Sequence, residues 1–217
     1  MRWIRGRRER LRAWRVDGLS DARVPFVGLT GGLGAGKSTA LEALERLGAA
    51  VLSTDSVVHD LYATPAVRDA FVERFGSDVA PAGVVDRAAV AGRMFAEDED
   101  RRWVESRLWP LVGERMMGWR VEVDQLRPRP PVAVVEVPLL YESGLEGAFD
   151  ATIAVIADEM LRTDRASRRG HTAVAERTAR QLSQEEKAAR ATHVVVNDGT
   201  PGELEAALSG VLDILSR

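Results

Sequence analysis

The stretch Gly31-Gly32-Leu33-Gly34-Ala35-Gly36-Lys37-Ser38 decides the fold. It fits the pattern G-x-x-x-x-G-K-[ST], in which glycines let backbone N–H groups approach phosphate oxygens. The lysine supplies a compact charge for the β- and γ-phosphates, and the serine hydroxyl can bind Mg²⁺. The stretch therefore predicts a nucleoside triphosphate site. The alternative is a glycine-rich turn that carries Lys and Ser by chance.

The residues on either side of this loop indicate a βαβ unit. The apolar run Val24–Leu29 predicts a buried strand before the loop, and 38–47 predicts a helix that Gly48 ends. Residues 49–52 then read as a second short strand. A helix between two close strands predicts a parallel sheet, and we expect the positive N-terminus of that helix to point at the phosphates.

The segment 56–125 carries apolar residues at helical spacing and predicts a helical insert. We expect breaks in it at Pro65, Gly76, residues 81–83, Gly92 and Pro110. One apolar face is expected from Trp103, Leu108, Trp109, Leu111, Val112 and Met116. A core role for the two tryptophans is the simpler interpretation, and a ligand platform is the alternative.

The last third alternates again between strands and helices. Strands are predicted at 132–137, 151–156 and 192–196, with an Arg-rich helical stretch at 158–190 and a final helix at 202–215. Residues 24–217 therefore predict one α/β domain with a side lobe. Residues 1–23 hold eight Arg against three acids and predict a disordered basic extension, with contact to a membrane surface or an acidic partner as the alternative.

Composition excludes several classes of protein. The chain of 217 residues has a formal charge of −3 and no cysteine. A disulfide framework and a thiolate zinc site are therefore excluded, and we expect no nucleic-acid partner. No apolar run reaches the length of a membrane span, so we expect no stable membrane association. Of 30 basic residues, only Lys37 and Lys187 are lysine.

Among proteins with such a loop, the sequence favours a small-molecule kinase. The only asparagine, Asn197, is followed by Asp198, so a guanine-binding Asn-Lys-x-Asp motif is absent. A kinase needs a carboxylate beside the acceptor hydroxyl. Asp55 follows the second strand, at the sheet edge where ligands gather. Its alternative role is to cap a helix that starts at Ser56.

From Val27 to Leu215 the chain resembles the dephospho-CoA kinase family. The resemblance rests on the loop continued to Thr39, on Asp55, on Phe75-Gly76 with 83–87, and on Pro138-Leu139-Leu140-Tyr141-Glu142. In the last third it rests on Arg177, Gln181, Lys187 and Asn197-Asp198-Gly199. It implies a P-loop NTPase-like three-layer sandwich with a parallel sheet, a helical acceptor-binding insert over about 56–125 and a helical lid over about 158–190.

The resemblance also implies an activity and a site. The reaction is transfer of the γ-phosphoryl group of ATP to the ribose 3′-hydroxyl of dephospho-CoA, the last step of coenzyme A synthesis, with Mg²⁺ at Ser38. Catalytic roles fall on Asp55, Lys37 and Arg165, and substrate contacts on His59, Glu142 and Arg169. Phosphate contacts fall on Gly32, Leu33, Gly34, Ala35, Gly36, Lys37, Ser38 and Thr39.

Two departures from the family pattern leave alternatives open. Ser53-Thr54-Asp55 stands where the family commonly has Asp-Ala-Asp, and Trp109-Pro110 stands where it commonly has His-Pro. The alternatives are another small-molecule or nucleotide kinase, or a weakly active ATP-binding regulatory module. We further expect a cytoplasmic protein that is a monomer or a weak homo-oligomer.

Overall fold

The computed structural model describes residues 23–168 and 181–216. The basic extension, apart from Arg23, and Arg169 lie outside the described residues. The chain forms two compact units: unit 1 joins the residues up to Leu52 to those from Arg120 onward, and unit 2 comprises Ser53–Trp119.

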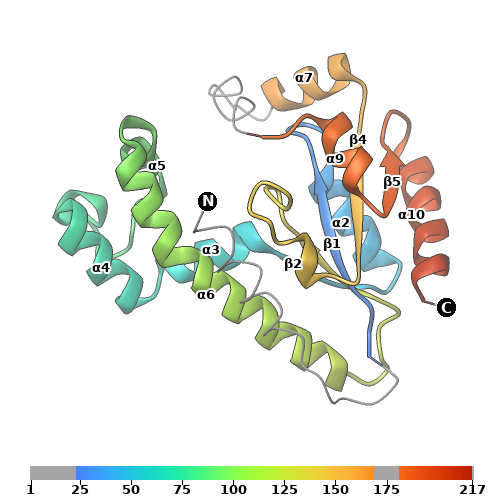
Figure 1. Cartoon of the computed structure of the whole chain (residues 1–217), viewed down its shortest axis with the longest axis horizontal. Coiled ribbons are helices and arrows are strands. Elements are labelled where there is room, and N and C mark those ends of the chain that lie inside the picture. Colours follow the sequence, from blue (N-terminus) through green and yellow to red (C-terminus); the bar gives the residue numbers. More distant parts are fainter. Residues whose placement is uncertain (1–22, 169–180, 217) are drawn as a thin grey trace. The chain divides into compact units, whose positions relative to one another are not determined.

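Unit 1 is built on a five-stranded sheet in the order β2-β3-β1-β4-β5 (Figure 1). Its central strand β1 (Phe26–Gly31) pairs in parallel with β3 (Ala133–Glu136) and β4 (Ala151–Ile156), and β4 pairs in parallel with β5 (His193–Val196). The fifth strand is β2 (Ala50–Ser53). Every residue of β1 is buried, as a strand covered on both faces must be. The predicted α/β fold with a parallel sheet is confirmed.

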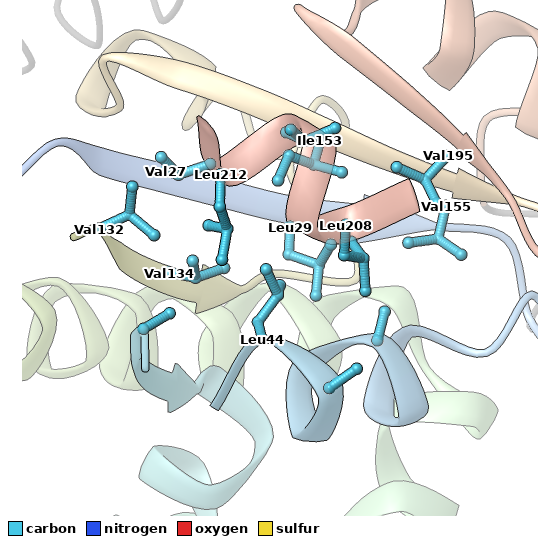
Figure 2. Packing of buried hydrophobic residues seen from close by; sticks show 14 of the residues in the cluster. Val27, Leu29, Leu44, Val132, Val134, Ile153, Val155, Val195, Leu208 and Leu212 are labelled. Atoms are coloured by element: carbon cyan, nitrogen blue, oxygen red, sulfur yellow. The ribbon is translucent and has the colours of Figure 1, made fainter. Parts of the chain in front are cut away.

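Helices cover both faces of this sheet. On one face, α2 (Lys37–Arg46) and α10 (Pro201–Leu215) pack Leu44, Leu208 and Leu212 against Val27 and other strand residues (Figure 2). Leu44 and Leu208 are fully buried, so truncation of either to alanine is expected to cost about 2–5 kcal/mol.

The other face of the sheet carries α9 (Gln184–Arg190), which contacts β1 and β4. Strand β4 is preceded by a short 3-10 turn, η2 (Glu146–Ala148), and followed by helix α7 (Glu159–Arg168). The ring of Phe149, just after η2, stacks on Phe26 of β1 with ring centroids 4.9 Å apart. The sheet therefore lies between two helical layers, and each layer covers one face of β1.

Unit 2 is helical. It contains α3 (Thr54–Tyr62), α4 (Pro65–Phe75), the 3-10 turn η1 (Ser77–Val79), α5 (Arg87–Ala96) and the larger part of α6 (Asp98–Gln125). Its aromatic core centres on Phe71, which is fully buried and makes edge-on contacts with Tyr62, Phe75 and Trp103. The core interpretation of Trp103 agrees with this packing.

Three expectations for this segment are wrong. Gly92 lies inside α5, and α6 continues through Pro110. A proline inside a helix costs about 3 kcal/mol through its lost hydrogen bond, but buried residues in neighbouring turns, such as Leu108 and Met116, offset this cost. Trp109 is 36% exposed, since it lies a third of a turn away from the buried Leu108.

No helix in the described part of the chain is long and apolar enough to cross a membrane.

Candidate active site

The phosphate loop lies between the end of β1 and the start of α2, as the sequence predicts. Gly34 and Gly36 have positive φ angles of 76° and 93°, and Gly36 is the N-cap of α2. A Cβ at Gly34 would collide with the carbonyl oxygen of Arg162, and one at Gly36 with the side-chain nitrogen of Asn197. Both glycines are therefore required by conformation and by close approach of other chain segments.

The arrangement fits a triphosphate. The N-cap of α2 is Gly36, which has no side chain, so the first N–H groups of α2 donate no hydrogen bond to a side chain at that position. Lys37 curls back over the loop, and its Nζ donates to the carbonyl oxygens of Gly31 and Gly32 at 3.1 and 3.0 Å. Ser38 is exposed in the first turn, where its hydroxyl can bind a cation. These donors and the helix N-terminus favour an anion with Mg²⁺ bound beside it.

Helix α7 packs directly on the loop. Nε of Arg162 donates to the Leu33 carbonyl oxygen at 3.1 Å, and its guanidinium lies over Gly32, where a Cβ would be 3.2 Å from Cζ. Arg165, one turn from Arg162, donates from Nη1 to the carbonyl oxygen of Asn197 at 3.0 Å. The predicted catalytic Arg165 therefore belongs to the same cluster as the loop.

Asn197 links β5 to the loop. The residue is 7% exposed, and its side chain donates from Nδ2 to the Ala35 carbonyl oxygen at 2.9 Å. Its backbone N–H donates to the carbonyl oxygen of Ile156. Neither Asn197 nor Arg162 was among the site residues predicted above. The signal for Asn197 was present in its motif with Asp198 and Gly199, whereas nothing in the sequence separates Arg162 from the other arginines of α7.

The turn after β3 brings Glu142 to a largely enclosed place, where its side chain is 14% exposed. Its Oε1 accepts from the N–H of Leu182 at 2.8 Å and pairs with Nζ of Lys187 at 3.0 Å. Burial lowers the pKa of Lys187, and the charge of Glu142 opposes that effect. The predicted substrate contact of Glu142 stays a prediction.

Asp55 and His59 lie in unit 2, on α3. Both are exposed and one helical turn apart, so they share a face of the helix. The alternative role of Asp55 as a helix cap is wrong, because α3 starts at Thr54 and its N-cap is Ser53. Asp55 therefore occupies the first turn with its side chain open to solvent.

Comparisons with known proteins identify the family. The family model for dephospho-CoA kinase matches residues 25–203. The dephospho-CoA kinase of Anaeromyxobacter dehalogenans is 38% identical over 196 residues, which cover 87% of this chain and 89% of that protein. The dephospho-CoA kinase of Moorella thermoacetica is 35% identical, with coverages of 86% and 88%.

Solved structures share the fold. The crystal structure of TT1252 from Thermus thermophilus superposes with a TM-score of 0.76 at 32% identity, covering 89% of this chain and 98% of that one. The dephospho-CoA kinase from Campylobacter jejuni gives a TM-score of 0.63 at 20% identity, with coverages of 88% and 96%, and shows the fold alone. The comparisons do not favour a kinase with another acceptor or a regulatory module. The chain belongs to the dephospho-CoA kinase family.

Proposed function

We propose that the chain transfers the γ-phosphoryl group of ATP to the ribose 3′-hydroxyl of dephospho-CoA, giving coenzyme A and ADP. The observation that carries the proposal is the phosphate loop of unit 1, in which Gly36 is the N-cap of α2 and Lys37 lies on the rim of the loop. Membership of the dephospho-CoA kinase family indicates the acceptor, and the loop can bind the phosphates of the donor, ATP.

The roles of the loop residues follow from their chemistry. Backbone N–H groups from Gly32 to Thr39 bind the phosphates, and Lys37 moves from the loop carbonyl oxygens to the β- and γ-phosphates when ATP enters. Arg165 adds charge near the transferring group. Ser38 would hold Mg²⁺, which would neutralise phosphate charge when bound. Because the transition state is loose, positioned charges carry most of the catalysis.

Asp55 orients the acceptor hydroxyl and takes its proton. Two observations support this role: the carboxylate is exposed, and it does not cap α3. Asp55 also follows the carboxyl end of β2 by two residues, and ligands of parallel sheets gather at such ends. His59, on the same helix face, and Arg169 are proposed to contact the acceptor. A cytoplasmic location and a monomeric or weakly associated state stay predictions.

A coupled assay for ADP release with Mg-ATP tests the function. We expect turnover that depends on dephospho-CoA and not on adenosine, with a loss of about 10²-fold or more in Asp55→Asn. Asp60→Asn, an exposed carboxylate on the same helix, is the control and should keep full activity. Folded, ATP-binding protein without turnover would overturn the function, and turnover that survives Asp55→Asn would remove Asp55 from it.

A further inference from the structure

Lys187 is the one fully buried charged side chain among the described residues, with an exposed fraction of 0%. Its Nζ donates to the carbonyl oxygen of Pro138 at 2.7 Å and pairs with Glu142 Oε1 at 3.0 Å. The Glu142 side chain is itself only 14% exposed. Both charges have therefore been largely withdrawn from water, which carries a desolvation cost before their attraction is counted.

The pair joins segments that are far apart in the sequence. The Pro138 carbonyl oxygen also accepts from the Thr30 hydroxyl of β1 at 3.3 Å, one residue before the phosphate loop. Glu142 Oε1 also accepts from the N–H of Leu182. The turn after β3, the last residues of β1 and the approach to α9 therefore meet at these two charges.

The start of α9 is fixed by a second set of bonds. The side chain of Gln184 bonds to both backbone groups of Ala157, at the end of β4, with distances of 3.1 and 2.9 Å. Ser183 and Glu186 close a capping box at the same point. Residues 182–187 therefore connect the carboxyl ends of β3 and β4, which flank β1 on either side.

Stability alone explains this pair poorly. Replacing a buried ion pair by apolar side chains of the same volume commonly leaves the stability of a protein unchanged or increases it. Among the described residues, the buried Oε2 of Glu142 has no hydrogen-bond partner, which adds a further cost. The sequence has only two lysines, Lys37 and Lys187, and one of them stands at this buried position.

We propose that Lys187 and Glu142 are positioning residues for phosphoryl transfer, whose ion pair holds the turn 138–144 and the start of α9 beside the phosphate-loop strand. The inference rests on the proposed function. The phosphate loop itself is held by other groups, Asn197 and Arg162. Loss of the pair therefore impairs the transfer step and spares ATP binding.

The test is the double variant Lys187→Met/Glu142→Leu, which removes both charges and leaves neither one buried alone. We expect a melting temperature within about 5 °C of wild type, an ATP dissociation constant within about twofold, and a kcat at least tenfold lower. Glu142→Gln, which keeps the shape and removes the charge, is expected to lower kcat in the same direction and serves if the double variant fails to fold.

The control is Arg46→Met/Glu205→Gln, which removes an exposed ion pair with an N–O distance of 2.8 Å between α2 and α10. We expect it to leave kcat unchanged. A folded double variant at positions 187 and 142 with wild-type kcat would overturn the inference, as would a loss confined to ATP affinity. Wild-type protein that does not phosphorylate dephospho-CoA overturns the proposed function instead, so the two failures are distinct.

Discussion

The buried amide of Asn197 donates to the carbonyl oxygen of Ala35, 162 residues earlier, and so ties the end of β5 to the middle of the phosphate loop. The backbone N–H of Asn197 bonds to Ile156, and its carbonyl oxygen accepts from Arg165. One residue thus joins β4, β5, α7 and the loop. This arrangement makes the shape of the loop depend on residues that do not belong to its motif.

Asn197→Ala should therefore weaken ATP binding. The change leaves the Ala35 carbonyl oxygen without its buried donor and opens a space beside Gly36, at a cost to stability of about 1–3 kcal/mol. We expect the ATP dissociation constant to rise about tenfold, measured by titration with a fluorescent ATP analogue. Asp198→Asn, at the neighbouring exposed position, is the control. Wild-type affinity in Asn197→Ala would show that the loop holds its shape without this bond.

Gly36→Ala should abolish nucleotide binding through the same contact. Gly48 gives a matched control, because its φ of 91° is close to the 93° of Gly36, and a Cβ there meets no atom within 4 Å. Both changes carry the strain of a non-glycine residue at positive φ, about 1–2 kcal/mol. Only Gly36→Ala also displaces Asn197. We expect ATP affinity to fall at least 30-fold in Gly36→Ala and to stay within about twofold in Gly48→Ala; equal losses would contradict the close contact.

The sequence predicted the parts of the site that are local. The glycine pattern, Lys37 and the switch from strand to helix lie within a dozen residues, and each has a conformational cause that one segment reveals. The predicted helix break at Pro110 was wrong. The expectation that proline ends a helix considers the lost hydrogen bond and leaves out the burial of nearby residues such as Met116. The contacts of Asn197 and of Lys187 could not be predicted from the sequence, because each contact joins residues that only the folded sheet brings together.

The dependence of stability on pH should report the buried lysine. Burial lowers the pKa of Lys187 from its ordinary value of 10.5, although Glu142 raises it in part. Between the lowered pKa and 10.5, the unfolded chain binds a proton at this lysine that the folded chain has lost, so this group makes stability rise with pH. We expect the free energy of unfolding of wild type, minus that of Lys187→Met/Glu142→Leu, to increase as pH rises toward 10.5. A difference that does not increase as pH approaches 10.5 would contradict the lowered pKa.

Arg162→Met should raise the KM for ATP more than it lowers kcat. The guanidinium of Arg162 lies on Gly32 and bonds to the Leu33 carbonyl oxygen, so it supports the loop from the side of α7. Its loss removes a bond to a charged donor, about 1.5–3 kcal/mol, which corresponds to a rise in KM of roughly tenfold to 100-fold. Arg46→Met, an exposed arginine at the end of α2, is the control for loss of charge.

Arg165→Met should lower kcat more than it raises the KM for ATP. Arg165 contacts the Asn197 carbonyl oxygen and has further guanidinium nitrogens for a phosphate. If it stabilises the charge that develops on the transferring group, kcat falls by about 10²-fold or more while the KM for ATP changes little. Steady-state kinetics of the two variants side by side separate these roles. A large rise in KM with unchanged kcat in Arg165→Met would assign Arg165 to ground-state binding, with Arg162 as its partner in that task.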